Sequence, residues 1–345
     1  MGDTFFNIQH GYLEGIVRGI KSHLLGASEY ANLSQCETLE DLRLSLQATD
    51  YAPVLTADIG NLDVRELEDR LRTHLVDEFN EVKRNSSEPL TTLLNYIQHG
   101  HMIDNVVMLL LGTLSGKPVA ELVAKCHPLG RFPNMGTIGI ATNSSELYEA
   151  VLIDTPLAPY FKECSITEEK LDELNIEVIR CVLYKSYIES FYDYCQGLGD
   201  TTAEIMAELL KLECDRRAMT ISLNSLGTGL SKDIKESLLP ARGHLHPYYL
   251  PELAKIDDVE QLKTIVEGLP EYKGIFDDGE ENLEDKLIQK EVHMCIDSFL
   301  HQFHYGIFYA IFKLKQQEVT NLIWIAECIT QKSRHKIETC IPHYP

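Results

Sequence analysis

The apolar residues of the stretch 62–82 recur every three or four positions along the chain. They include Leu67, Leu71, Leu75, Phe79 and Val82. Because an α-helix turns once every 3.6 residues, this spacing gathers the apolar side chains on one face and leaves the polar ones on the other. The stretch therefore predicts an amphipathic helix.

The same helical character extends over residues 171–195 and 283–337. The second stretch has no proline, and Gly306 is its only glycine. Since glycine is a weak helix former, Gly306 predicts the place where this stretch bends or breaks. The alternation of apolar and polar positions that is typical of strands is absent, and clusters of Pro and Gly separate the helical stretches. We therefore expect an all-α chain.

Three short stretches of the sequence resemble one another. They are ATDYAPVL at 48–55, DTPLAPYF at 154–161 and LPEYKGIF at 269–276. Each follows a helical segment and ends in an apolar pair, and the distance between successive stretches is about a third of the chain. We therefore predict one all-helical domain over 1–345 that consists of three approximate repeats, 1–112, 113–227 and 228–345.

An acidic helix opening follows each of these three corners. The openings read LEDRL from position 67, LDEL from 171 and LEDKL from 283. Acidic side chains in the first turn of a helix are favourable because they lie near its partial positive charge. Each corner is thus expected to lead into a new helix.

Two prolines, Pro156 and Pro159, bracket the middle corner. A proline ring fixes φ and prevents a preceding helix from continuing. The pair predicts a rigid structural corner that sets the angle between one helical layer and the next. The alternative is an ordinary loop.

Charge limits the partners that this surface can bind. The chain has 53 acidic and 31 basic residues, a formal net charge of -22. Such a surface repels nucleic-acid phosphates and anionic lipid headgroups, so we expect basic or apolar protein partners and no nucleic acid. The 345 residues, 44% of them hydrophobic, are enough for one large core or for two to three smaller units.

The nine cysteines include no C-x-x-C pair, which indicates reduced thiols in a cytosolic setting. The N-terminal sequence has no basic segment followed by an apolar one, and no run reaches the roughly 18 apolar residues that a spanning helix needs. We expect neither a secretory signal nor a membrane span.

Candidate chemistry is weak throughout the sequence. GTLSGKP at 112–118 differs from a phosphate-binding loop because three residues, not four, separate its glycines, and Pro118 lacks the hydroxyl that holds magnesium. His301 and His304 have the spacing of helical metal ligands, but no second such pair accompanies them. Cys126 and His127 are adjacent in sequence, which does not by itself make a nucleophile. We predict no catalytic, cofactor or metal site.

Two charged or aromatic stretches remain. Residues 213–217, ECDRR, lie in a helical stretch, where mixed charges form ion pairs within a helix or a buried network between repeats. The only tryptophan, Trp324, lies in an apolar cluster wider than one helical stripe. It is either a core residue or an anchor at a partner surface, where tryptophan is enriched.

Long stretches of the sequence resemble the subunit d family of eukaryotic V-type proton ATPases, which includes the prokaryotic C subunits. The resemblance runs essentially from end to end. The stretches that carry it include NIQHGYLEGIVRG at 7–19, MIDNVVMLLLGTL at 102–114, KCHPLGRF at 125–132, LIDTPLAPYF at 152–161, DRRAMTISLNS at 215–225 and NLIWIAECI at 321–329. One difference from the family pattern, Ile153 in place of a frequent valine, conserves volume closely enough to be tolerated.

This resemblance implies an all-helical funnel with three-fold-like repeats and no active site. It also implies a place on the cytosolic face of the membrane sector of an endomembrane proton pump. The implied partners are the proteolipid c-ring, the central stalk subunits and the a subunit of the membrane sector, and the implied task is to transmit rotation from the stalk to the ring.

Six residues are our candidates for coupling or partner contact. They are Glu318, Trp324, Glu327 and Cys328 in the C-terminal helix, with Asp172 and His127 as supports. Two other classes of function stay open at this point. One is a free cytosolic helical-repeat scaffold, and the other is an enzyme that uses Cys126 and His127 or His301 and His304.

Overall fold

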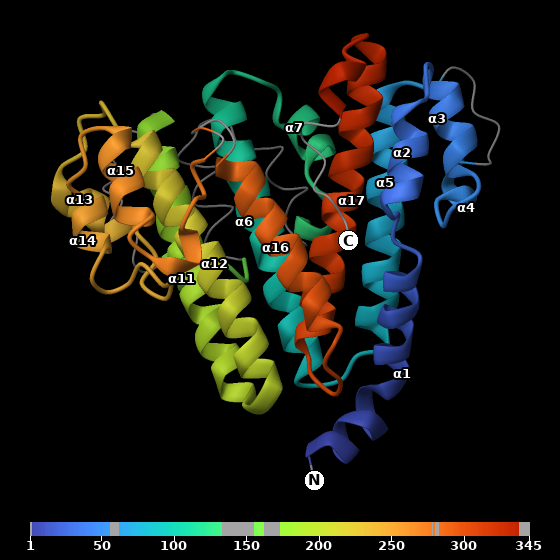
Figure 1. Ribbon diagram of the computed structural model, residues 1–345, viewed down its shortest axis with the longest axis horizontal. Coiled ribbons are helices and arrows are strands. Elements are labelled where there is room, and N and C mark those ends of the chain that lie inside the picture. The colour runs from blue at the N-terminus through green and yellow to red at the C-terminus, as the bar shows by residue number, and fades with distance from the viewer. Residues whose placement is uncertain are drawn as a thin grey trace. The chain divides into compact units, whose positions relative to one another are not determined.

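The computed structural model describes residues 2–55, 62–132, 155–161, 173–277, 279 and 283–337. All regular secondary structure in these ranges is helical, which confirms the all-α prediction (Figure 1). The chain divides into two compact units: unit 1 consists of Met1–Leu94 and Glu284–Pro345, and unit 2 of Asn95–Leu283. The three repeats and their funnel arrangement stay a prediction.

Unit 1 is organised around two long helices that lie side by side, α5 (Val64–Arg84) and α17 (Gly306–Thr330) (Figure 1). The apolar face predicted for 62–82 is confirmed, because all five of its predicted residues are buried in α5. Phe79 of α5 packs against Phe312 of α17 with ring centroids 4.7 Å apart. Buried residues cover most of α17, as its broad apolar pattern indicates.

The remaining helices of unit 1 surround this pair. They are α1 (Gly2–Ser22), α2 (Ala27–Ser34), α3 (Leu39–Leu46), α4 (Ala52–Leu55), α16 (Leu283–Ser298), η4 (Arg334–Lys336) and the first turn of α6 (Leu90–Leu114), which continues into unit 2. Helices α1 and α3 contact α17, and α4 contacts α5. The chain from Leu25 to Leu55, which holds α2, α3 and α4, is called segment 25–55 below.

The predicted break at Gly306 is confirmed. Helix α16 ends at Ser298, and α17 begins at Gly306 itself. Of the predicted acidic openings, LEDKL starts α16 as expected, with Glu284 and Asp285 in its first turn. LEDRL lies one turn inside α5, because the side chain of Asp63 accepts the Glu66 amide and so caps the helix earlier. Residues 171 and 172 of LDEL lie outside the described residues.

Unit 2 is organised around a hairpin of α11 (Glu173–Leu198) and α12 (Asp200–Asn224) (Figure 1). The helix predicted for 171–195 corresponds to α11. Only Gly199 separates the two helices, and its φ of 70° lies in the left-handed region that glycine adopts at little cost. Gly199 and the next residue, Asp200, whose φ is 46°, together reverse the chain.

Shorter elements complete unit 2. They are α7 (Val119–Lys125), η1 (Pro128–Gly130), α10 (Ala158–Phe161), α13 (Lys232–Leu238), α14 (Leu250–Leu253), α15 (Val259–Val266) and η2 (Pro270–Tyr272). Both α14 and α15 contact α12. The chain from Leu239 to Phe276, which holds α14, α15 and η2, is called segment 239–276 below.

Candidate functional site: two buried carboxylate clusters

Glu318, one of the predicted coupling residues, is fully buried in α17. Its Oε1 accepts a hydrogen bond of 2.7 Å from the Tyr51 hydroxyl, and its Oε2 accepts one of 2.6 Å from the Leu25 backbone N–H. Leu25 and Tyr51 lie near opposite ends of segment 25–55. One carboxylate therefore fastens both ends of this segment to α17.

Two further ionisable side chains lie beside Glu318. The Lys315 Nζ is 3.6 Å from Glu318 Oε1 and 3.5 Å from Glu78 Oε2 of α5. The Lys315 side chain is 1% exposed and the Glu78 side chain 14%. We call Tyr51, Glu78, Lys315 and Glu318 cluster 1.

Burial dominates the ionisation of cluster 1. It raises the pKa of Glu78 to about 7, although the nearby Lys315 ammonium opposes the rise. Burial also raises the pKa of Glu318 above its ordinary value, again against the effect of Lys315. The pKa of Tyr51 rises well above its ordinary value because of burial and the Glu318 charge, so its hydroxyl remains a donor.

Unit 2 contains a corresponding arrangement around Asp215, which is 1% exposed in α12. Its carboxylate accepts hydrogen bonds from the Tyr272 hydroxyl at 2.7 Å and from the backbone N–H groups of His244 and Leu245 at 2.9 and 3.1 Å. The donors again lie near opposite ends of one short-helix segment, 239–276. We call Asp215, Tyr272 and these two amides cluster 2.

Gly243 allows the chain to approach Asp215 this closely. A Cβ atom at this position would collide with the Asp215 carboxylate. Burial raises the pKa of Asp215, while its three hydrogen bonds lower it and so favour the ionised form. Cluster 2 is therefore a closely fitted site in which any side chain at position 243 competes with the carboxylate.

The two tyrosines occupy the same position in two of the three similar corners. The middle corner has Leu157 there, and leucine lacks a hydroxyl with which to make this bond. Leu157 and Tyr160 are buried instead, whereas Pro156 and Pro159 are exposed. Pro159 is the second residue of the one-turn helix α10. The neighbours of the two prolines therefore supply the buried surface of this corner, and the structural role of the prolines stays a prediction.

The other predicted coupling residues of α17 lie outside cluster 1. Trp324 is half-buried, and its Nε1 donates to the Lys336 carbonyl at 3.4 Å. Glu327 is partly exposed and accepts a hydrogen bond from Gln331 one turn later. Cys328 is buried, with a side chain 3% exposed. The structure thus places only Glu318 of these four in a buried ionic cluster.

The two predicted supports have different outcomes. His127 precedes η1, and its Nδ1 accepts the Leu129 amide at 3.2 Å. Its backbone exchanges two hydrogen bonds with the Asn105 side chain, and its ring stacks on His101 at 4.2 Å. His127 therefore has structural contacts of its own. Asp172 lies outside the described residues.

The residues considered for an enzyme or metal site make structural hydrogen bonds instead. The Cys126 Sγ donates to the Leu122 carbonyl at 3.5 Å, and burial raises the pKa of this thiol to about 11, so it is not a ready nucleophile. The His304 Nε2 lies 3.0 Å from the Ser298 carbonyl, and burial lowers the pKa of this side chain to about 4. Within the described ranges, no three potential metal ligands come together. Likewise, no helix there has the length and apolarity to cross a membrane.

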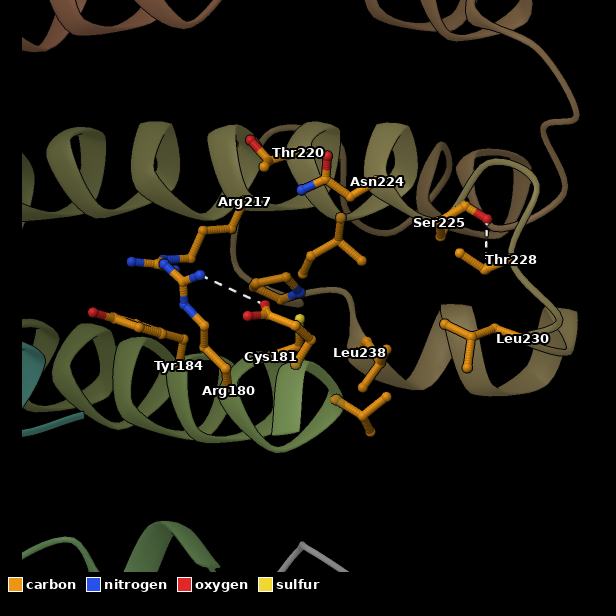
Figure 2. Close-up of a pocket in the computed structure, with 14 residues that line it drawn as sticks. Arg180, Cys181, Tyr184, Arg217, Thr220, Asn224, Ser225, Thr228, Leu230 and Leu238 are labelled. Carbon is orange, nitrogen blue, oxygen red and sulfur yellow. Dashed lines mark hydrogen bonds and ion pairs between the residues drawn. The ribbon is translucent and has the colours of Figure 1, made fainter. Parts of the chain in front are cut away.

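A pocket of about 280 Å³ lies between α11 and α12 in unit 2 (Figure 2). The guanidinium of Arg217 lies 3.3 Å from the centre of the Tyr184 ring, and its Nε donates to Glu213 at 2.7 Å. Arg180, at the same end of the pocket, pairs with Glu177 at 3.5 Å. Burial raises the pKa of the Cys181 thiol in its wall to about 11. Both arginines are thus paired already, and the pocket has neither a free anion site at these residues nor an activated thiol.

The ECDRR stretch forms the ion pairs that its composition predicts. Arg216 and Arg217 both donate to the buried Glu213 within α12. Asp215 of the same stretch belongs to cluster 2, a role that its sequence neighbourhood does not reveal. The signal available for both clusters was the repeated tyrosine position in the corners, since Glu78, Lys315 and Asp215 carry no motif.

Comparison with known proteins is consistent with this non-catalytic arrangement. The profile of the family described as ATP synthase (C/AC39) subunit matches residues 13–340. A protein named V-type proton ATPase subunit d from Dictyostelium discoideum is 46% identical over 98% of this chain and 96% of its own. Its namesake from Saccharomyces cerevisiae is 42% identical over 100% of both chains. The C subunit of an A-type ATP synthase from Pyrococcus horikoshii is 25% identical over 75% of this chain and 68% of its own. The chain therefore belongs to the V/A-type ATPase d/C family, whose members are non-catalytic subunits of the ATPase complex.

Proposed function

We propose that this chain is a non-catalytic coupling subunit of a rotary V-type proton ATPase. In this role it links the central stalk to the proteolipid c-ring, so that rotation driven by ATP hydrolysis is transmitted to proton transport. The observation that carries the proposal is similarity to proteins named V-type proton ATPase subunit d over 98% or more of the chain.

The internal structure supports a mechanical role. Each unit fastens both ends of a short-helix segment to a long helix through one buried carboxylate, Glu318 in unit 1 and Asp215 in unit 2. Satisfied buried polar networks make packing rigid and specific, because each alternative arrangement leaves a polar group without a partner. A part that transmits torque needs this kind of resistance to deformation.

The proposed partners are the c-ring, the central stalk subunits and the a subunit of the membrane sector. The proposed location is the cytosolic face of an endomembrane that carries the pump, with attachment through other subunits. A charge of -22 favours protein surfaces over anionic lipid as the place of attachment.

The test is a paired measurement on membranes from cells that lack the protein. Inhibitor-sensitive ATP hydrolysis and proton uptake are measured before and after the purified chain is added back. We expect both activities to depend on the chain, and the chain to co-purify with the c-ring. Persistence of both activities in its absence would overturn the proposal and favour the free-scaffold alternative.

A further inference from the structure

Cluster 1 contains more charge than its fastening role requires. In cluster 2, one hydroxyl and two backbone amides donate to a single carboxylate. Glu318 receives the corresponding donors from Tyr51 and Leu25, yet the buried Lys315 and the mostly buried Glu78 lie beside it as well. Burying a lysine and a second carboxylate costs free energy, so their presence suggests a further role.

The charges of cluster 1 do not balance when both carboxylates are ionised. Glu78 and Glu318 lie 3.5 and 3.6 Å from the single Lys315 ammonium. Asp50 adds a further nearby acid, although the surface residue His23 pairs with it at 3.3 Å. Two mostly buried carboxylates that share one cation favour the uptake of one proton.

The other groups that face Glu78 do not supply the missing positive charge. Burial and the Lys315 charge lower the pKa of His74, which favours the neutral imidazole. Tyr51 and the neighbouring Tyr30 are uncharged phenols. A proton on a carboxyl group is the simplest way to neutralise the excess.

The geometry leaves room for that proton on Glu78. The buried atoms Glu78 Oε2, Lys315 Nζ and His74 Nε2 have no hydrogen-bond partner within the described part of the chain. His74 Nε2 lies 3.5 Å from Glu78 Oε1, longer than a good hydrogen bond. These three atoms are therefore the ones in and beside cluster 1 whose hydrogen-bonding capacity a proton on Glu78 can use. Glu318, in contrast, already accepts a bond at each of its oxygens.

We propose that Glu78 is a proton-binding site within unit 1, and that release of its proton weakens the attachment of segment 25–55 to α17. The Glu78 O–H bond breaks, the proton passes to solvent water, and a second negative charge is left beside the one that holds Leu25 and Tyr51. The site would thus make the free energy that holds segment 25–55 on α17 depend on pH near neutrality.

The sign of the effect follows from linkage. A carboxyl with a pKa of about 7 in the folded chain and 4.5 in the unfolded chain favours folding most below pH 4.5, and this contribution is lost as the pH rises through about 7. Between about pH 5.5 and about pH 8, the equilibrium constant for opening unit 1 should rise on the order of 30-fold.

Hydrogen exchange of the full-length chain tests the proposal. Protection factors, which correct for the intrinsic effect of pH, are measured for segment 25–55 across this pH range, and Trp324 fluorescence follows urea unfolding of unit 1. We expect the unfolding constant of unit 1 to rise on the order of 30-fold in the wild-type chain, and protection of segment 25–55 to fall in the same pH range by up to this factor. In Glu78→Gln, which mimics the protonated carboxyl, we expect protection at about pH 8 to stay near the value at about pH 5.5.

Glu291→Gln is the matched control. Glu291 of α16 is 17% exposed and pairs with its own lysine, Lys313, at 2.9 Å, so it has no excess charge to neutralise. This variant should keep the wild-type pH dependence. An equal pH dependence in wild type and Glu78→Gln would overturn the proposal, as would its loss in Glu291→Gln.

A second variant tests the proposal independently if Glu78→Gln fails to fold. Lys315→Met removes the ammonium that favours ionised Glu78, so the midpoint of the pH dependence should move upward. A midpoint that stays in place or moves downward would contradict the assignment of the proton to Glu78.

Discussion

Removal of one hydroxyl from cluster 2 tests whether the buried carboxylate holds segment 239–276. Tyr272→Phe keeps the ring and deletes the group that donates to Asp215 at 2.7 Å. Asp215 retains its two backbone donors, at positions 244 and 245, but one of its oxygens loses a partner in a site that is 1% exposed. We expect the segment to detach from α12 more readily.

The magnitude follows from the type of bond. A hydrogen bond to a charged group contributes about 1.5–3 kcal/mol, so the opening equilibrium of segment 239–276 should increase about 10-fold to 150-fold. The Tyr272 bond lowers the pKa of Asp215, which burial raises, so the substitution should raise this pKa further. Because the lost bond stabilises the ionised form of Asp215, the loss should be larger at neutral pH than in acid.

Hydrogen exchange of the full-length chain, resolved by peptide, measures this loss in segment 239–276 directly. Tyr248→Phe makes the same chemical change in the same segment at a side chain that is 82% exposed, and it should change the opening free energy by less than about 0.5 kcal/mol. If Tyr272→Phe is as neutral as Tyr248→Phe, or if its effect is the same in acid as at neutral pH, the role assigned to the Asp215 carboxylate is wrong.

Three further predictions follow from the same structure. Gly243→Ala should lower the free energy of opening of segment 239–276 by about 2–4 kcal/mol, because the new Cβ displaces the Asp215 carboxylate. Hydrogen-exchange protection equal to that of the wild-type chain would contradict this. Under the proposed function, Pro156→Ala together with Pro159→Ala should lower the number of protons pumped per ATP more than it lowers assembly, and an unchanged ratio would refute this. Alkylation of Cys181 near pH 8, followed by mass spectrometry, should be about 100-fold slower than in the unfolded chain and accelerate as the pH rises, because its thiol pKa is raised from 9.0 to about 11.

Local patterns made much of the helical structure predictable. The apolar stripe that begins at Leu67 and the lone Gly306 in a long apolar stretch both act over a few residues, and the structure confirms α5 and the start of α17. Propensity and periodicity are properties of neighbouring residues, so one sequence is enough to reveal them. The same reasoning placed LEDRL at a helix start, and there the capping side chain of Asp63 moved the boundary.

The buried clusters depend on contacts that no local pattern encodes. Glu318 could be proposed from the sequence as a coupling residue, but its partner Tyr51 is 267 residues away. A lysine at position 315 predicts an exposed position on the helix, because lysine is rarely buried without a partner. One of the two carboxylate partners of Lys315, Glu318, lies three residues further along the same helix, and the approach of α5 to α17 supplies the other, Glu78. The sequence pattern that pointed to the clusters is the recurrence of tyrosine in two corners. Its meaning depends on the carboxylates to which these tyrosines donate, and the sequence does not identify them.

The two clusters suggest how buried hydrogen bonds stiffen a helical protein under torque. A short segment fastened at one end can swing about that end, whereas one fastened at both ends to the same carboxylate can move only if both bonds break together. Each broken bond leaves the buried carboxylate with one donor fewer. The free-energy cost of releasing the segment therefore includes the loss of both bonds. Segments 25–55 and 239–276 are both held in this double manner. Under the proposed function, loss of either carboxylate should therefore loosen a whole segment, and with it the transmission of rotation, before it unfolds the long helices that carry the load.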